Sequence, residues 1–306
     1  MALTEEQKFQ LENFFNQSNF AEEGGVITDL DGTAIHEYES RLIIPSEVEA
    51  GLKKIHDRGR PVVINTLRFP ISVIKTFGRE WYNISGAPVP TVLMNGSQLG
   101  YIIETKDKDL KYEELAAFPL TQTEIGDILN VVEKLLADNI PELLIFYYPR
   151  NWTKGEIIWT PFKERINHIQ NKYSSASQVY SSDFKQLHDD LSAEDICMVF
   201  LLIDVPEDRL MAYQHTKKSN FFTHAGTDKL SGAEQIAEIL NFKLHHSLGA
   251  GDTEMDVFLK AVGLAVHVGN PYLSFEGVLP PLKISGSHEL GELLFQLTTM
   301  QRTIVK

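Results

Sequence analysis

The strongest constraint on the fold is a regular alternation of apolar strand-like runs with helical segments in the first hundred residues. Strands are predicted at residues 26–30, 62–66 and 91–94, with helices at residues 45–56 and 70–81 between them. The run 62–66 is too apolar for a strand with one face in water, so we expect it to be buried on both faces. This order of elements is typical of a parallel sheet covered by helices on both sides.

The alternation stops after about residue 105 and returns at about residue 223. A long amphipathic helix is predicted at residues 121–139, and Thr121 with Glu124 forms a capping box at its start. The segments that follow predict an antiparallel hairpin (143–148 with 156–160), a strand (196–204), a helix near Pro206 and a short strand (220–224). We therefore expect residues 106–222 to form an inserted α+β domain.

The last part of the chain resumes the pattern of the first. A helix capped by Ser231 and Glu234, a strand at 244–249, a helix at 255–262, a strand at 264–268 and a closing helix at 288–297 are predicted. Residues 1–105 and 223–306 are therefore expected to form one Rossmann-like, doubly wound α/β core. Within it, residues 1–23 are expected to be a helical extension on the surface.

Composition narrows the possible partners and the location. The net charge of −14 argues against binding to nucleic acid or to an anionic membrane, because both depend on clustered Lys and Arg. The single cysteine, Cys197, excludes an intrachain disulfide. No apolar stretch approaches the roughly 18 residues of a membrane span, and the start of the chain lacks the features of a signal peptide. We expect a cytoplasmic protein, and the sequence leaves its oligomeric state open.

Two carboxylates lie two positions apart where the first predicted strand ends. Residues i and i+2 of an extended chain point the same way, so Asp29 and Asp31 are expected to share one pocket. One carboxylate can then attack a substrate while the other moves protons, and together they attract a hard cation. An ordinary Asp-Gly turn explains the pair equally well when it is considered alone.

Three later features are also ambiguous individually. Thr66 and Arg68 can hold a phosphate at a helix start, or they can be a helix cap with a solvated arginine. Lys229 can balance the charge of a phosphoryl group, or it can be a surface lysine. Asp252 and Asp256 lie one helical turn apart after a Gly-rich turn. A dinucleotide site is rejected there, because the third glycine is missing and carboxylates occupy the phosphate position.

The combination and order of these residues resemble the four-motif set of the haloacid dehalogenase-like hydrolases. The matching positions are Asp29-x-Asp31-Gly-Thr, Thr66, Lys229 and Gly251-Asp252-x-x-x-Asp256, within residues 24–96 and 223–270. The insertion between the second and third motifs is similar to the type-two α+β cap of the Cof-like, sucrose-phosphatase-like and mannosyl-phosphoglycerate-phosphatase-like branch. The chain departs from that branch at Leu67, where glycine is frequent, and at Gly232, which follows the lysine later than usual.

The resemblance implies a Mg²⁺-dependent phosphatase that works through an aspartyl-phosphate. Asp29 would be the nucleophile, and Asp31 would protonate the leaving oxygen and then activate water. The metal would be held by the Asp29 carboxylate, the Asp31 backbone carbonyl and Asp252. Independently of the resemblance, four clustered carboxylates would repel one another without a cation, which also favours a metal site.

The remaining roles follow the same resemblance. Thr66 would bind a phosphoryl oxygen, Lys229 would balance the carboxylates, and Asp256 would position Lys229 or a metal-bound water. The predicted catalytic set is Asp29, Asp31, Thr66 and Lys229. The predicted phosphate-binding set is Thr66, Arg68, Lys229, Asn95 and Gly96.

The expected substrate is a small phosphorylated metabolite, either a sugar phosphate or a glycosyl phosphate, selected by the cap. Arg150 and Lys154, in the predicted hairpin loop of the cap, are candidate contacts for an anionic substrate. Two alternatives stay open. The aspartyl-phosphate can pass to another sugar in a phosphotransferase or mutase, or the chain can be a catalytically silent binding protein on the same fold.

Overall fold

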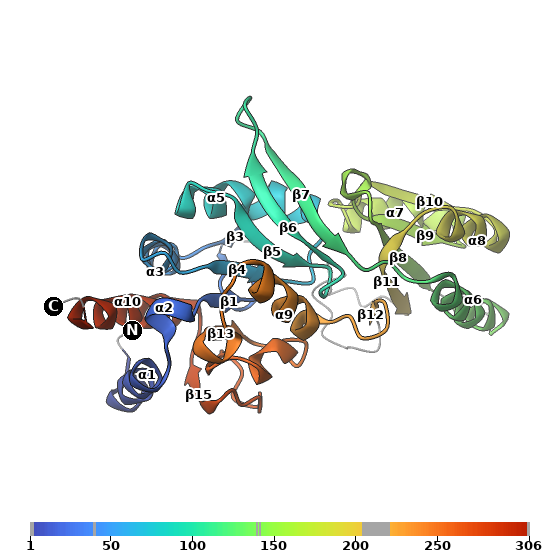
Figure 1. Cartoon of the computed structure of the whole chain (residues 1–306). Helices are drawn as coiled ribbons and strands as arrows, with labels where there is room; N and C mark the ends of the chain where they lie inside the picture. Colours follow the sequence, from blue (N-terminus) through green and yellow to red (C-terminus); the bar gives the residue numbers. More distant parts are fainter. Residues whose placement is uncertain (1–2, 39–40, 139, 141, 204–220, 305–306) are drawn as a thin grey trace.

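The computed structural model describes residues 3–38, 41–138, 140, 142–203 and 221–304 of the chain. These residues form an eight-stranded sheet, a five-stranded sheet and a separate two-stranded hairpin. Figure 1 shows the five-stranded sheet and its helices beside the large sheet, to which they are joined by extended segments. No helix in the described part of the chain is both long enough and apolar enough to cross a membrane.

The large sheet contains all the strands predicted for the core. In spatial order its strands are β15 (Leu279–Ile284), β14 (Leu264–Val268), β13 (Leu248–Gly251), β1 (Val26–Thr28), β4 (Val62–Asn65), β5 (Val89–Leu93), β6 (Gln98–Glu104) and β7 (Leu110–Ala117). The six strands from β15 to β5 are parallel, and β6 and β7 extend the sheet as antiparallel strands. Within the parallel part, β1, β4, β13 and β14 are buried along their whole length, as expected for strands covered on both faces, whereas the edge strand β15 is partly exposed.

Both faces of this sheet are covered, because successive strand residues belong to different apolar clusters. Val26 and Ile64 pack with helices on one face, whereas Ile27 and Val63 pack with helices on the other. The first face is covered by α1 (Glu5–Gln17), α3 (Ser46–Asp57), α5 (Arg79–Ser85) and α10 (Ser287–Ile304). The second is covered by α9 (Lys229–Ile239) and a 3-10 turn, η7 (Val257–Lys260). The predicted doubly wound α/β fold is confirmed.

Shorter elements complete the core. They are α2 (Phe20–Glu23), the hairpin β2 (His36–Tyr38) with β3 (Arg41–Ile43), α4 (Pro70–Val73), the π-helical turn η1 (Ile74–Gly78) and the 3-10 turn η6 (Leu244–His246). The turn η1 continues directly from α4 into α5, so the helix predicted at 70–81 exists but contains a π turn. Such turns are rare and occur frequently near functional sites.

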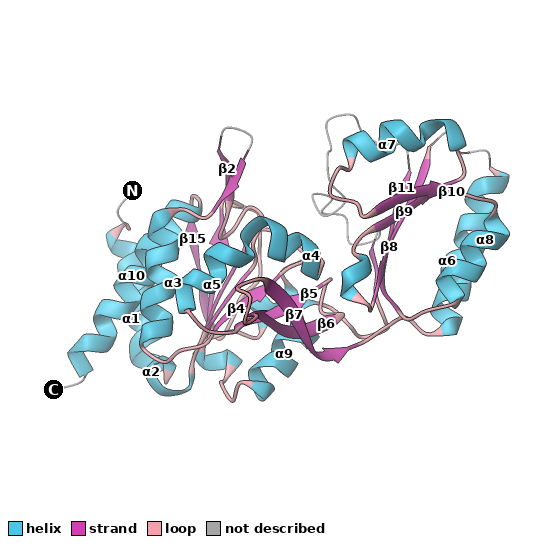
Figure 2. Ribbon diagram, turned by 90° about the horizontal axis from the view of Figure 1, so that it is seen from above, coloured by secondary structure: helices cyan, strands magenta, loops and turns pink. Residues whose placement is uncertain are grey.

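The inserted segment forms a second layered unit, called the cap below. Its sheet has the order β10 (Gln178–Ser181), β9 (Ile157–Thr160), β8 (Leu143–Pro149), β11 (Ile196–Ile203) and β12 (Phe221–Phe222). Figure 2 shows α7 (Ile166–Lys172) on one side of this sheet and α6 (Gln122–Ala137) with α8 (Phe184–Ser192) on the other. The predicted inserted α+β unit and the β8–β9 hairpin are confirmed. The helix predicted near Pro206 lies outside the described residues.

The structure differs from the sequence analysis at the start of the insertion. The inserted domain was expected to begin at residue 106, whereas β7 pairs with β6 at the edge of the large sheet. The sequence of β7 is Leu-Lys-Tyr-Glu-Glu-Leu-Ala-Ala, and only Tyr112 is fully buried in it. A strand at a sheet edge needs few apolar residues, so its sequence gives a weak signal.

The chain passes between core and cap twice, and one carboxylate joins the two crossings. Glu124, near the first crossing (residues 118–121), accepts a hydrogen bond from the backbone N–H of Ala225 at 2.7 Å. Its other oxygen lies 3.0 Å from Nδ1 of His224, in the second crossing (residues 223–228). Partial burial raises the pKa of Glu124, but hydrogen bonds from His224, Thr121 and Ala225 outweigh this and lower it to about 2.

Candidate active site

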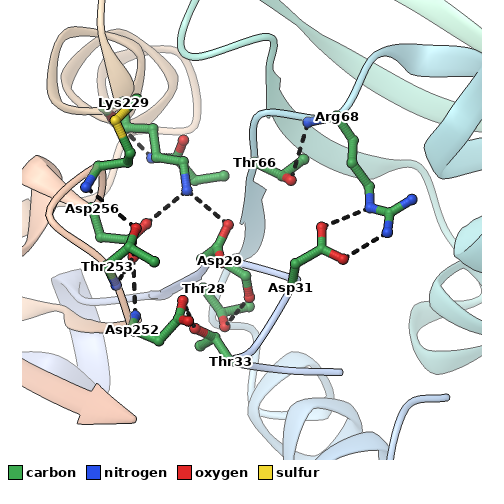
Figure 3. Close-up of polar contacts among 12 residues, drawn as sticks. Thr28, Asp29, Asp31, Thr33, Thr66, Arg68, Lys229, Asp252, Thr253 and Asp256 are labelled. Atoms are coloured by element: carbon green, nitrogen blue, oxygen red, sulfur yellow. Dashed lines mark hydrogen bonds and ion pairs between the residues drawn. The ribbon is translucent and has the colours of Figure 1, made fainter. Parts of the chain in front are cut away.

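Segments far apart in sequence meet at one edge of the large sheet. Asp29 follows β1, Thr66 follows β4 and Asp252 follows β13, and these three strands are neighbours and parallel. The carboxyl ends of parallel strands form the ligand crevice of an open α/β sheet. Lys229 is the first residue of α9 and reaches the same edge (Figure 3).

Lys229 joins two carboxylates at the centre of this group. Its Nζ donates to Oδ1 of Asp29 at 2.7 Å and to Oδ1 of Asp256 at 2.6 Å. The Lys229 side chain is 2% exposed, and the Asp256 side chain is completely buried. A buried ammonium needs such partners, because an unpaired charge away from water is very costly.

Burial and neighbouring charges shift the pKa values of Lys229 and Asp29. Burial opposes the charge of Lys229, but Asp256 and Asp29 outweigh this effect and raise the pKa of Lys229 above its ordinary value. Burial also raises the pKa of Asp29 well above its usual range, although Lys229 opposes this rise. The carboxylates Asp256, Asp252 and Asp31 raise the pKa of Asp29 further. The site therefore holds more negative charge than one lysine balances.

Three contacts fix Lys229 at the start of its helix. Asp228 caps α9 by accepting hydrogen bonds from the N–H groups of Leu230 and Ser231, both at 2.9 Å. Asn65 donates from Nδ2 to the Lys229 carbonyl at 2.9 Å. The predicted cap at Ser231 with Glu234 is wrong, because Asp228 begins the helix three residues earlier. This earlier start makes Lys229 a helical residue whose side chain is directed into the core.

Gly96, which follows β5, brings the backbone against Asp228, the residue that caps α9. Its φ is 92°, and a Cβ added there would lie 2.1 Å from the Asp228 carbonyl oxygen. The sequence analysis placed Gly96 in the phosphate-binding set. The structure places it where only glycine allows the backbone to approach the start of α9 so closely.

Replacing Gly96 with alanine is expected to displace Asp228 and with it Lys229. We expect the free energy of unfolding to fall by at least about 2 kcal/mol more than in the matched control Gly226→Ala. Gly226 has a similar φ of 79° but nothing within 4 Å of the added Cβ, so it carries the same backbone strain without the clash. Thermal unfolding of the two variants measures the difference. Equal losses would show that the close approach to Asp228 is unimportant.

Asp256 also organises the loop that carries Asp252. Its Oδ2 accepts from the N–H groups of Asp252 at 3.0 Å and Thr253 at 2.9 Å. A Cβ on Gly251 would lie 2.6 Å from the Asp256 Cγ, so glycine is required there as well. The helix predicted at 255–262 is wrong: only the 3-10 turn η7 forms there.

Asp252 is held from two sides. Thr33 donates from Oγ1 to Oδ1 of Asp252 at 3.1 Å, and Asn270 donates from Nδ2 to its carbonyl at 2.8 Å. A Cβ on Gly32 would lie 2.3 Å from Oδ2 of Asp252. Burial and then the charge of Asp256 raise the pKa of Asp252 to about 7. The first and fourth motifs are therefore in direct contact.

The arrangement of carboxylate oxygens fits a hard cation. One oxygen from each of Asp29, Asp252 and Asp256 lies within 4.8 Å of the others. Both oxygens of Asp256 already accept hydrogen bonds, whereas Oδ2 of Asp29 and Oδ2 of Asp252 have no hydrogen-bond partner among the described residues. Carboxylate oxygens without such a partner match the ligands that Mg²⁺ takes in proteins.

Asp31 does not share this cluster, contrary to the expectation that Asp29 and Asp31 point into one pocket. The extended strand β1 ends at Thr28, so neither residue belongs to the regular strand on which that expectation was based. Figure 3 shows the Asp31 carboxylate turned toward Arg68. Arg68 donates to it from Nε at 2.7 Å and from Nη2 at 2.6 Å, a bidentate pair.

The Arg68 side chain is only 1% exposed and is held on several sides. Its Nη1 donates to Ser72 Oγ at 3.0 Å, and its guanidinium lies 5.0 Å from the centre of the Phe77 ring. Its backbone N–H donates to Oγ1 of Thr66 at 3.2 Å. Arg68 was predicted to bind phosphate or to be solvated at a helix start; the structure makes it the partner of Asp31.

The other residues predicted to contact the substrate do not all lie at this site. Thr66 is buried beside Asp31 and Asp29, as Figure 3 shows, and Asn95 is buried with its Oδ1 lacking a hydrogen-bond partner among the described residues. Arg150 pairs with Glu114 and Asp195, and Lys154 pairs with Glu194. These two cap cations are therefore already paired within the protein and lie outside the Lys229 cluster.

Three supporting residues were given no role by the sequence analysis: Thr33, which lies in the first motif, Asn65 and Asn270. Asn65 carried a usable signal, because it is the one polar residue of the buried strand β4. Asn270 directly follows Gly269, whose φ is 66°, at the end of β14. An asparagine after a strand-ending glycine at the crevice edge is a comparable signal.

Comparisons with known proteins identify the family and the fold. The family model of the haloacid dehalogenase-like hydrolases matches residues 26–272. No curated protein sequence matches the chain. A HAD/Cof-like hydrolase from Plasmodium vivax is similar in structure, with 17% identity, a TM-score of 0.63, and coverage of 97% of this chain and 100% of that chain.

Two further solved structures share the fold. A phosphatase of the same superfamily from Bacteroides thetaiotaomicron has 16% identity and a TM-score of 0.60, covering 91% of this chain and 96% of that chain. A sugar phosphatase of HAD subclass IIB has 17% identity and a TM-score of 0.56, covering 80% of this chain and 87% of that chain. The family match covers most of the chain, so this protein belongs to the haloacid dehalogenase-like hydrolases, as its motifs predicted.

Proposed function

We propose that this protein is a Mg²⁺-dependent phosphatase that hydrolyses a small phosphorylated metabolite through an aspartyl-phosphate on Asp29. The observation that carries the proposal is the buried bridge from Lys229 to Asp29 and Asp256. Phosphoryl transfer needs alignment and charge neutralisation more than elaborate covalent chemistry. A fixed lysine beside the nucleophilic carboxylate supplies both.

In the first step an Asp29 oxygen bonds to phosphorus as the bond to the leaving oxygen breaks. Lys229, held by Asp256, balances charge on the transferring group, and the Thr66 hydroxyl donates to one of its oxygens. In the second step water attacks the aspartyl-phosphate, which releases phosphate and restores Asp29.

Asp31 acts as the acid for the first step and the base for the second. In the structure both its oxygens accept hydrogen bonds from Arg68. Its role therefore requires the carboxyl group to turn from Arg68 toward the leaving oxygen. Its 30% exposed side chain leaves room for that rotation.

Asp29 and Asp252 would hold Mg²⁺, with the Asp31 backbone carbonyl as a third protein ligand. When bound, the ion neutralises phosphoryl charge and balances the crowded carboxylates, which is why we expect the activity to depend on it. Asp256 keeps a supporting role, because its oxygens are occupied by Lys229 and by backbone N–H groups.

The proposed substrate is a sugar phosphate or glycosyl phosphate. The cap lies beside the crevice, and one structure with this fold is a sugar phosphatase. A cytoplasmic location and the absence of nucleic-acid partners stay predictions from the sequence.

Removing the metal should abolish phosphate release. The assay uses an aryl phosphate and a panel of sugar phosphates, each with magnesium and with a chelator. We expect a fall of at least about a hundredfold with chelator and recovery when magnesium is restored. Release that is equal in chelator would contradict the proposed metal dependence. Product analysis with an added sugar acceptor separates hydrolysis from phosphotransfer, and no turnover in any condition would favour the silent binding protein.

A further inference from the structure

A cavity of about 370 Å³ lies between core and cap directly beyond Arg68. The core contributes Arg68, Ser72, Lys75 and Thr76 from α4, η1 and the preceding loop; the cap contributes Ser174–Ser177 from the loop between α7 and β10. Its volume is within the range of small-molecule sites and equals on the order of ten water molecules.

The charge of this cavity is opposite to that of the protein. The chain has a net charge of −14, yet the described lining residues include two cations and no carboxylate. Arg68 is already paired with Asp31. Lys75 is exposed and forms no ion pair with any described residue, so its charge is available to a ligand. Hydroxyl groups of serine and threonine make up most of the remaining polar lining.

The cavity also lies where the proposed reaction places the leaving group. The phosphoryl group would bond to Asp29, and the leaving oxygen would be at Asp31. Arg68 contacts Asp31 on the side away from Lys229 (Figure 3). Arg68 and Ser72, which are hydrogen-bonded to each other, both line the cavity. Asp31 is not among the described lining residues, so Arg68 and Ser72 are what connect the cavity to the proposed position of the leaving group.

We propose that the substrate carries a second anionic group, a carboxylate or a second phosphate, which binds Lys75 in this cavity while hydroxyls bind the serine-rich cap loop. This inference rests on the proposed function and specifies the class of its substrate. The cap cations Arg150 and Lys154 do not supply this contact, because each is already paired with a carboxylate. The second anion also approaches Arg68 and so competes with Asp31 for it, which helps Asp31 turn to the leaving oxygen.

Matched pairs of substrates test the proposal. Glycerol 3-phosphate and 3-phosphoglycerate differ by a hydroxymethyl group and a carboxylate, and glucose 6-phosphate and glucose 1,6-bisphosphate differ by a second phosphate. We expect kcat/KM to favour the member with the second anionic group in at least one pair by about tenfold, the value of one charged hydrogen bond. Lys75→Met should reduce that ratio to near one, and Lys75→Glu should invert it. Lys163→Met, at an exposed lysine outside the cavity, should leave the ratio unchanged.

The outcomes separate this inference from the proposed function. Metal-dependent release from an aryl phosphate with no preference in either pair, or with a preference that Lys75→Met retains, would overturn the inference and leave the phosphatase intact. Absence of release from every substrate would sink the phosphatase itself. Calorimetric titration of the same pairs into Asp29→Asn protein measures recognition without turnover; equal affinities within both pairs there would also overturn the inference.

Discussion

Asp29→Asn protein is expected to lose phosphate release by about 10⁴-fold or more while remaining folded. The amide is nearly the same shape as the carboxylate, and its oxygen can still accept from Lys229 at the position now 2.7 Å from Nζ. It cannot attack phosphorus, however, and losses of this size are typical when a nucleophile is removed. Initial rates with saturating magnesium measure the effect.

The same substitution should not lower stability in the absence of metal. Burial and the neighbouring carboxylates raise the pKa of Asp29, so its ionised form is disfavoured in the folded state. A neutral amide removes that penalty, and the melting temperature in chelator should equal or exceed that of the wild type at neutral pH. Asp109→Asn, at an exposed position in the β6–β7 turn, is the matched control and should change neither property. Residual release within tenfold of wild type would exclude Asp29 as the nucleophile.

Lys229→Met is expected to lower both activity and stability. The methionine fills a similar volume but leaves Asp29 and Asp256 buried without their shared cation. Breaking a buried ion pair in this way costs about 3–5 kcal/mol. Thermal unfolding in chelator measures the loss, and Lys163→Met is the control for removal of an exposed lysine.

The stability of this variant should depend on pH in a definite direction. A carboxyl group whose folded-state pKa is above its unfolded value binds more protons in the folded state, so stability falls as pH rises between the two values. The pKa of Asp29 is raised even with Lys229 present. The deficit of Lys229→Met relative to wild type should therefore shrink as pH falls toward about 4. A deficit that is constant with pH would show that lost packing, not uncompensated charge, causes it.

The sequence predicted the architecture well because its signals are local. The strands ending at Thr28 and Asn65 are short apolar runs followed by polar turns, and Thr121 with Glu124 caps α6 as expected. Elements with weak local signals were missed, including β10, which is short and half-buried, and the hairpin of β2 with β3. A strand without a fully buried face carries little hydrophobic pattern to detect.

For the candidate site, the sequence predicted that Asp29, Lys229 and Asp252 would lie together, but it did not predict which side chains pair. Order along the chain identified Asp29, Lys229 and Asp252, and the parallel sheet brings them to one edge. Nothing in the sequence indicates that Arg68 pairs with Asp31, because that contact depends on how two turns are folded. The start of α9 was mispredicted because Ser231 with Glu234 fits the usual capping-box pattern, whereas the structure uses Asp228 with Ser231 one turn earlier.

The hydrogen bonds that join both crossings to Glu124 define how the cap can move. Two linkers tied side by side form a single pivot, and rotation about a pivot displaces points in proportion to their distance from it. Core–cap contacts such as that between the Phe69 and Tyr148 rings, which lie 5.4 Å apart, would be broken by such a rotation. Asp29, Lys229 and Asp256 all belong to the core and would keep their spacing during such a rotation. Movement of the cap to admit or release a leaving group would therefore not disturb the core residues that align the phosphoryl group.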